Sequence, residues 1–317
     1  MKKLISIFFI MVVSLIIVSN PLTGEYIKAL TMKAEPAFSY SAGDHLLEQI
    51  EEKAIEYDIK PIDAKIDPIW KAVPGLNGRK VDIEGSYRKM KKDGEFNEDK
   101  LQFQKIKPKV HLADLPPNPI YKGNPNKPMV AFIINVAWGN EYLSDMLTIL
   151  KEQNVKASFF LEGRWTKNNP ELAKMIVSAG NEIGNHSYTH PDMKHLTSAR
   201  IDEEIQKTND VIEATTGVRP KWFAPPSGSY RDEVVKIAAK EHLGTVMWSV
   251  DTIDWQKPET NVLINRVMSK VHNGALILMH PTESTTKALE QLIIQMKEKN
   301  LEIGTVSDLL NEENLKR

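Results

Sequence analysis

The sequence predicts an α/β fold, a distorted barrel of about seven parallel strands preceded by a small α+β module. After Pro128, short apolar runs of strand length alternate with amphipathic runs of helix length, seven times in about 190 residues. The chain has 317 residues, which suits one large α/β domain with a smaller module. Its hydrophobic fraction of 41% and charged fraction of 26% are those of a globular protein.

The predicted strands of the large domain are its short apolar runs, and the predicted helices are its amphipathic runs. The strands are expected over 129–134, 157–161, 182–184, 221–224, 244–248, 275–279 and 302–305. The helices are expected over 141–152, 171–178, 198–215, 231–239, 262–270, 285–298 and 306–312. In parallel α/β barrels the functional site lies beyond the C-terminal ends of the strands, so the residues that follow each strand are the candidates.

The N-terminus has the pattern of an export segment. Lys2 and Lys3 precede an apolar run over 4–18, which is the order found in secretory signals. The run is shorter than the roughly 20 residues that span a bilayer, and no small-residue cleavage site follows it. We therefore expect residues 1–21 to be a signal peptide or an uncleaved signal-anchor, and both alternatives stay open.

Three further segments separate this N-terminus from the large domain. Residues 22–40 lack a period and are expected to be a linker, and residues 41–112 are expected to form the small α+β module. Residues 113–128 contain five prolines, which favour an extended connector and forbid a helix. The large domain is expected to cover 129–317.

Composition excludes several classes of function. The 41 basic and 42 acidic residues balance, so nothing indicates a nucleic-acid surface. Cysteine is absent, which excludes disulfides, thiolate metal sites and a cysteine nucleophile. Ser227 lacks the Gly-x-Ser-x-Gly surroundings of a hydrolase nucleophile, and no glycine-rich phosphate loop is present.

Polar and aromatic side chains follow four of the predicted strands. Two histidines four residues apart can share a divalent metal, because neutral imidazole is a common ligand. A carboxylate beside an indole can line a sugar pocket or cap a helix. The four groups are His186 with His190, the segment 223–228 with Pro225 and Pro226, Asp251 with Asp254 and Trp255, and Leu278 with His280.

In order and spacing these four motifs resemble those of the NodB-type polysaccharide deacetylases, which are carbohydrate esterases. The similarity covers about 129–310. The form Phe-Ala-Pro-Pro-Ser-Gly over 223–228 is similar to the sporulation-associated branch of the family, from endospore-forming bacteria. The resemblance implies a hydrolase of carbohydrate metabolism that cleaves a non-peptide C–N bond in an N-acetylated glycan.

The resemblance also implies roles for individual residues. His186 and His190 would be ligands of a divalent metal, Zn or Co, with His280 as the acid that protonates the leaving amine. Asp254 would orient or tune His280. Five residues would contact substrate: Pro225, Pro226, Ser227, Trp255 and Leu278.

Three positions depart from the family's pattern. Asn135 stands where the family has its catalytic base, Val136 replaces the metal-binding aspartate, and Ala224 replaces the arginine that holds the base. Losing a general base typically costs about 10²–10⁴ in rate, and losing one of three protein ligands weakens the metal. His195 and Glu141 lie near enough in sequence to be replacements, but both are interpreted as surface residues.

Three functions therefore stay open. The first is a metal-dependent N-deacetylase acting on cell-wall or spore-cortex glycan. The second is an inactive protein that binds such glycan, and the third is an envelope scaffold in sporulation. In each case we expect a location outside the cytoplasmic membrane, in the forespore or spore envelope, with membrane contact through the N-terminal segment if it is not cleaved.

Overall fold

The computed structural model of the protein describes residues 44–315, which fall into two compact units. Within this range the smaller unit contains residues 44–53 and 83–100, and the larger contains residues 54–82 and 101–315. The predicted export segment and linker lie outside the described residues. In residues 44–315 no helix is both long and apolar enough to cross a membrane.

The smaller unit is built from the first part of α3 (His45–Tyr57) and from α4 (Ile83–Met90). Leu46 and Ile50 of α3, with Tyr87 and Met90 of α4, are buried. The carboxylate of Asp44 accepts the backbone N–H of Leu46 at 3.1 Å, which satisfies one free amide at the start of α3.

The remaining N-terminal strands form two antiparallel pairs in the larger unit. β1 (Lys65–Asp67) pairs with β2 (Lys71–Val73), and β3 (Gly78–Val81) pairs with β4 (Phe103–Ile106). Residues predicted as one α+β module over 41–112 thus occur in both units, and the predicted domain boundaries stay predictions.

The large sheet of the larger unit is entirely parallel. Its strands lie in the order β10-β11-β5-β6-β7-β8-β9, with β12 also paired to β5. They are β5 (Met129–Val136), β6 (Ser158–Leu161), β7 (Glu182–Asn185), β8 (Trp222–Phe223), β9 (Gly244–Thr245), β10 (Val250–Asp251), β11 (Leu276–Met279) and β12 (Glu302–Gly304). This parallel half-barrel, with seven strands in its main order and β12 beside β5, confirms the predicted fold class.

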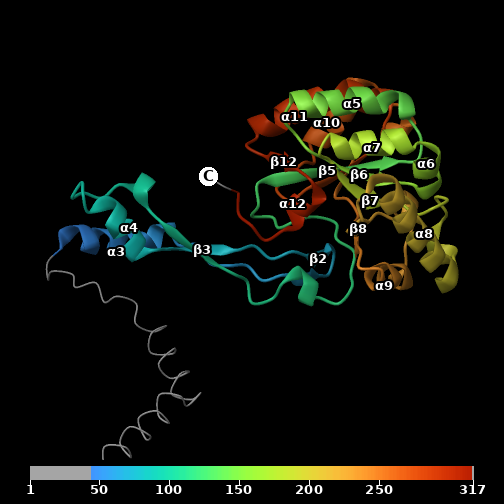
Figure 1. The fold of residues 1–317 in the computed structure, drawn as a ribbon. Coiled ribbons are helices and arrows are strands. Elements are labelled where there is room, and N and C mark those ends of the chain that lie inside the picture. Colours follow the sequence, from blue (N-terminus) through green and yellow to red (C-terminus); the bar gives the residue numbers. More distant parts are fainter. Residues whose placement is uncertain (1–43, 316–317) are drawn as a thin grey trace, which may run out of the picture. The chain divides into compact units, whose positions relative to one another are not determined.

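Helices follow the strands, and those before the last cover the outer face of the sheet (Figure 1). They are α5 (Asn140–Glu152), α6 (Gly163–Asn168), α7 (Pro170–Ser178), α8 (Ser198–Thr216), α9 (Asp232–Lys240), α10 (Thr260–Met268), α11 (Glu283–Glu298) and α12 (Val306–Leu310). The six-residue α6 was not predicted, because it is too short to show a period. It begins where Glu162 accepts the backbone N–H of Trp165 at 2.6 Å.

The central strand β5 explains how the sheet is packed. All eight of its residues are buried, as expected for a parallel strand that is covered on both faces. Successive side chains point to opposite faces: Phe132 and Ile134 belong to the core under the helices, whereas Ala131 and Ile133 belong to the barrel interior.

The N-terminal end of the barrel is closed by α12. Val306 and Leu309 pack into the barrel interior. The buried ammonium of Lys127 donates to the backbone oxygens of Asp308 at 2.5 Å and Asn311 at 3.0 Å, which secures the end of this helix. The opposite end of the barrel, where the strands finish, is therefore the end available for a site.

The strand predicted over 244–248 is wrong in its extent. Only Gly244 and Thr245 form β9, and the separate strand β10 follows at 250–251. Val246 instead bridges Ile120, whose backbone N–H donates to Thr245 at 2.9 Å. The chain thus leaves β9 to pair with the proline-rich connector before it reaches β10.

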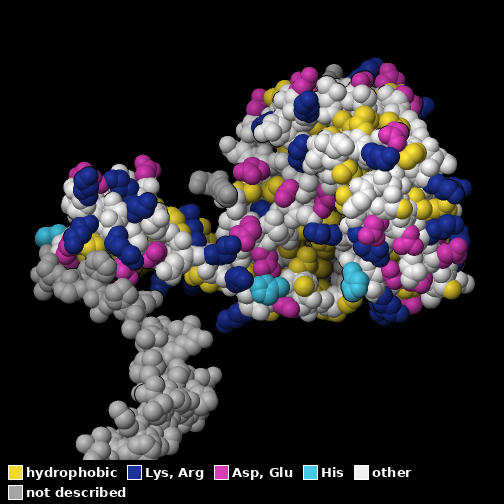
Figure 2. Space-filling view, in the orientation of Figure 1, with side chains coloured by type: hydrophobic (Ala, Val, Ile, Leu, Met, Phe, Trp, Pro, Cys, Tyr) yellow, Lys and Arg dark blue, Asp and Glu magenta, His cyan; other side chains and the backbone are white. Residues whose placement is uncertain are grey.

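Charge is dispersed over the face of the larger unit that Figure 2 displays. Basic and acidic side chains are interspersed there, and hydrophobic side chains gather in a hollow. A surface of this kind agrees with the balanced composition and gives no support to nucleic-acid binding.

Candidate functional site

A cavity of about 450 Å³ lies at the C-terminal ends of the strands. Its volume falls in the range of about 300–1,000 Å³ that is usual for small-molecule sites. Seven of the predicted site residues line it: Asn135, His186, His190, Ser227, Trp255, Leu278 and His280. Residues from both halves of the barrel sequence therefore meet in one place.

The other predicted site residues lie behind this cavity. Pro225 and Pro226 are buried and do not line it, because they form the turn that presents Ser227. Asp254 is fully buried behind His280. His195 and Glu141, considered as replacement groups, are exposed and do not line the cavity.

Four lining residues are not among the site residues named from the sequence, although Trp138 was considered as an aromatic that could serve glycan recognition: Ala137, Trp138, Trp248 and Asp251. Asp251 belongs to one of the quoted motifs and Trp138 follows the predicted strand over 129–134, so their positions could have been expected. Trp248 was placed inside a strand. A strand ending at Thr245, which the structure shows, would have identified it as a strand-end residue.

His280 is held by a buried carboxylate. Its Nδ1 lies 2.8 Å from Oδ1 of Asp254, and its backbone N–H donates to Oδ2 at 2.6 Å. Thr285, in the first turn of α11, donates its hydroxyl to the same Oδ2 at 2.5 Å. The carboxylate keeps the proton on Nδ1 of the neutral ring and leaves Nε2 as the nitrogen free to exchange a proton.

Trp138 covers this imidazole. The two rings are stacked, with centroids 5.8 Å apart and an angle of 10° between their planes. Trp138 and Trp255 are the large exposed aromatic residues of the cavity, with 47% and 57% of their surface accessible. Such indoles offer the flat apolar faces on which a sugar ring can lie.

His186 and His190 are neutral imidazoles. Nδ1 of His186 donates to the backbone oxygen of Ala224 at 2.7 Å, which leaves a lone pair on Nε2. Burial, aided by the neighbouring His190, lowers the pKa of His186 to about 3. Burial also lowers the pKa of His190, and the two ring centroids are 5.0 Å apart.

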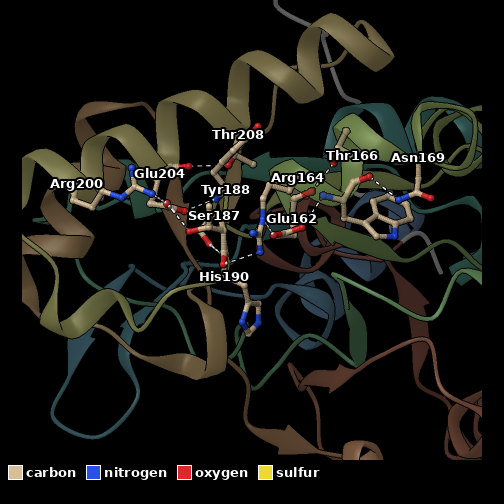
Figure 3. A network of polar contacts seen from close by, with 12 residues as sticks. Glu162, Arg164, Thr166, Asn169, Ser187, Tyr188, His190, Arg200, Glu204 and Thr208 are labelled. Atoms are coloured by element: carbon tan, nitrogen blue, oxygen red, sulfur yellow. Dashed lines mark hydrogen bonds and ion pairs between the residues drawn. The ribbon is translucent and has the colours of Figure 1, made fainter.

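The loop that carries His190 is fixed by Glu204 of α8. This buried carboxylate accepts the backbone N–H groups of Tyr188 at 2.8 Å and Thr189 at 2.7 Å, and the hydroxyl of Thr189 at 2.8 Å. Arg200, one turn earlier on α8, pairs with it at 2.6 Å. Figure 3 shows Glu204 between Arg200 and the loop. This residue was not identified from the sequence.

Several residues around the cavity have a strained backbone. Ser187, His190 and Ser227 adopt positive φ angles of 61°, 56° and 53°, and Ile253, just before Asp254, has a φ of 53°. Such angles are unusual without glycine, above all for a β-branched residue. Each costs about 1–3 kcal/mol and persists only where its surroundings impose it. The shape of the site is therefore strongly specified.

The residues present do not fit the metal of the family. Val136 is fully buried in the core under the helices, on the opposite face of β5 from Asn135. Among residues 44–315 no three His, Asp or Glu side chains are grouped so that they could hold a metal ion. Two imidazoles without a third protein ligand fall short of a catalytic zinc site, which usually has three.

His186 is expected to make stability fall in mild acid. It gains a proton near a pKa of about 3 in the folded protein but near 6.5 in the unfolded chain. Between these values the unfolded state binds more protons, so this group lowers the free energy of unfolding by about 1.4 kcal/mol per pH unit of acidification. Urea unfolding from about pH 6.5 to about pH 5 should show a shallower decline for His186→Asn.

The matched control for this experiment is His195→Asn. His195 is 74% exposed and should leave the pH dependence of the wild-type protein unchanged. Equal slopes for His186→Asn and the wild-type protein would show that His186 is not buried as a neutral ring.

Comparisons with known proteins agree with this geometry. The family model of the polysaccharide deacetylases matches residues 122–246. The uncharacterized protein YlxY of Bacillus subtilis is 57% identical over 307 residues, which cover 97% of this chain and 96% of that protein. A peptidoglycan-N-acetylglucosamine deacetylase of Bacillus cereus is 31% identical over 194 residues, covering 60% of this chain and 70% of the relative.

Solved structures of this family also resemble the chain. A CE4 family pseudoenzyme from Bacillus anthracis is 57% identical, with a TM-score of 0.81, and the match covers 85% of this chain and 96% of that one. A mutant of that protein with restored enzymatic activity is 56% identical, again with a TM-score of 0.81 and covering 85% of this chain and 99% of that one. The chain therefore belongs to the polysaccharide deacetylase family.

Proposed function

We propose that this protein binds amino-sugar glycan of the bacterial cell wall in its strand-end cavity without hydrolysing it. The observation that carries the proposal is the position of Val136. Its side chain is buried in the hydrophobic core, so it leaves the two histidines without a third ligand. Asn135, whose amide is not a useful base at neutral pH, lines the cavity where the family has its base.

The rest of the cavity supports binding. Its aromatic walls, its fixed His280 and its strained turns are all kept in a site that lacks the catalytic base. Strained backbone is costly, so a cavity without a use would be expected to relax. The relatives from Bacillus cereus and from Listeria monocytogenes are peptidoglycan deacetylases, which points to peptidoglycan as the glycan.

One observation favours a second candidate, slow N-deacetylation by an altered mechanism. His280, Asp254 and Thr285 form a complete chain of hydrogen bonds that could protonate a leaving amine. This candidate would need an activated water. The described residues supply no three-ligand metal site for it, and the position of the family's base is taken by Asn135.

The location of the protein belongs to the proposal as well. We infer export, with the apolar run over 4–18 as a signal peptide or anchor, and a role in the envelope of sporulating cells. The support for this part is the sequence pattern alone. Fractionation of sporulating cells would test it, since recovery in the cytoplasm would contradict it.

Binding without turnover can be measured directly. The full chain is expected to bind soluble peptidoglycan oligosaccharides in calorimetry and to release no acetate above a protein-free blank. Trp255→Ala should weaken binding by about tenfold or more, because a buried aromatic contact is a typical binding hot spot. Phe103→Ala, which removes an exposed ring of β4 outside the cavity, should not.

Two results would overturn the proposal. Acetate release by the wild-type protein that is lost in His280→Ala would establish the deacetylase instead. Absence of binding to any amino-sugar oligosaccharide would leave the envelope scaffold as the remaining function.

A further inference from the structure

Asn135 has an unused hydrogen-bonding group at the cavity. The side chain lines the cavity and only 4% of the residue is exposed. Its Oδ1 is buried and accepts no hydrogen bond from any described residue. A buried acceptor without a donor costs about 1–3 kcal/mol. A ligand with an N–H or O–H group would remove this penalty.

His186 supplies a second acceptor to the same cavity. Because its Nδ1 donates to the backbone oxygen of Ala224, its Nε2 is the unprotonated nitrogen of the neutral ring. Nε2 has no hydrogen-bond donor among the described residues. The cavity thus holds at least two acceptors, Asn135 Oδ1 and His186 Nε2, and both need a donor from a ligand.

The charge that lines the cavity is negative. Asp251 lines it, and no lysine or arginine is among the described residues that do. The backbone N–H of Ile253 donates to Oδ1 of Asp251 at 2.8 Å, which fixes this carboxylate at the rim of the loop. Ala224, whose backbone oxygen accepts the hydrogen bond of His186, stands where the family has an arginine, so this position adds no positive charge. The cavity therefore combines two open acceptors with a carboxylate, and its charge favours a positive ligand.

This arrangement distinguishes the two forms of an amino sugar. A free amino group, protonated near neutral pH, presents three N–H donors and a positive charge. An N-acetyl group presents one N–H donor, no charge and a carbonyl oxygen, which would be a further acceptor beside Asn135 and His186. The free amine satisfies more of the unpaired groups in the cavity and also meets the carboxylate of Asp251.

We propose that the cavity recognises glycan whose amino sugars are already de-N-acetylated, through an ammonium group bound by Asn135, His186 and Asp251. The inference rests on the proposed function of the cavity as a glycan site and names its ligand class. The protein would then bind the product of a deacetylation reaction, so a deacetylase would have to act before it.

The first test compares two ligands of equal length. Calorimetry with the full chain is expected to show at least about tenfold tighter binding of β-1,4-linked glucosamine oligomers than of N-acetylglucosamine oligomers. Tighter or equal binding of the acetylated oligomer would overturn the inference and leave the proposed function standing. Binding of neither oligomer, and of no peptidoglycan fragment, would contradict both.

A third ligand separates hydrogen bonding from simple charge attraction. An N,N,N-trimethylated glucosamine oligomer keeps the positive charge and loses all N–H donors. We expect it to bind as weakly as the acetylated oligomer, within about threefold, because Asn135 and His186 need donors. Binding as tight as that of glucosamine would overturn the assignment of these two acceptors.

Variants test the residues. Asn135→Leu and Asp251→Asn should each lower affinity for the glucosamine oligomer by about tenfold and leave affinity for the acetylated oligomer within about threefold. Asp145→Asn makes the same charge change on the exposed face of α5 and should leave both affinities unchanged. Circular dichroism confirms that each variant is folded. Equal losses for both oligomers would assign these residues to the shape of the cavity and overturn the inference.

Discussion

Replacing Asn135 and Val136 together with aspartate is expected to produce a zinc-binding protein that releases acetate from N-acetylated oligosaccharide. The first replacement supplies the general base. The second supplies the third ligand for His186 and His190, which requires the end of β5 to turn so that the side chain at position 136 leaves the core. Because a general base alone contributes about 10²–10⁴ in rate, acetate release should rise at least 100-fold above the wild-type background. Metal content and acetate release are measured on the same preparations.

The single variants are the controls. Asn135→Asp alone lacks the third ligand and should bind no zinc tightly, while Val136→Asp alone should bind zinc without turnover. Val136→Asp also buries a carboxylate in an apolar core, so without metal its melting temperature should be lower, and zinc should restore it. A double variant that binds zinc but releases no acetate would show that Ala224, or another departure from the family, also prevents catalysis.

Truncating Glu204 is expected to have the largest effect on stability. Glu204→Ala removes one carboxylate that accepts two backbone N–H groups, a hydroxyl and an arginine. The amides of Tyr188 and Thr189 would lose their buried partner, and the free energy of unfolding should fall by about 3–5 kcal/mol. Urea unfolding measures this change, and affinity for glycan should fall with it because the loop carries His190.

Glu203→Ala provides a close comparison. Glu203 is adjacent, 52% exposed, and pairs with the same arginine. Its removal should change the free energy of unfolding by no more than about 0.5 kcal/mol. Similar losses in the two variants would mean that Arg200, not the loop, is the partner that matters.

The sequence was sufficient to predict the barrel and most of the cavity. Strand-length apolar runs such as 129–134 indicated parallel strands, and the topology then required residues after those strands to meet. His186 and His280 were grouped for this reason, although more than 90 residues separate them, and the family resemblance added Asn135. Seven predicted residues line the same cavity.

Other features depended on three-dimensional detail. Glu204 reaches the His190 loop from a helix that begins eight residues later, and its side chain looks in sequence like any charged helical residue. Pro225 and Pro226 were expected at the surface of the cavity, yet the turn buries them and presents Ser227. Local propensity does not fix which side of a turn faces a ligand.

The opposite orientations of Asn135 and Val136 on β5 have an evolutionary consequence. Asn135 affects the cavity and can change back at little risk to the fold. Val136 contributes to the core, where burial of such a side chain stabilises the protein by about 1.5–3 kcal/mol. A lineage returning to aspartate at this position would first lose stability and regain it only when metal is bound. Selection for folding alone would therefore disfavour aspartate at position 136.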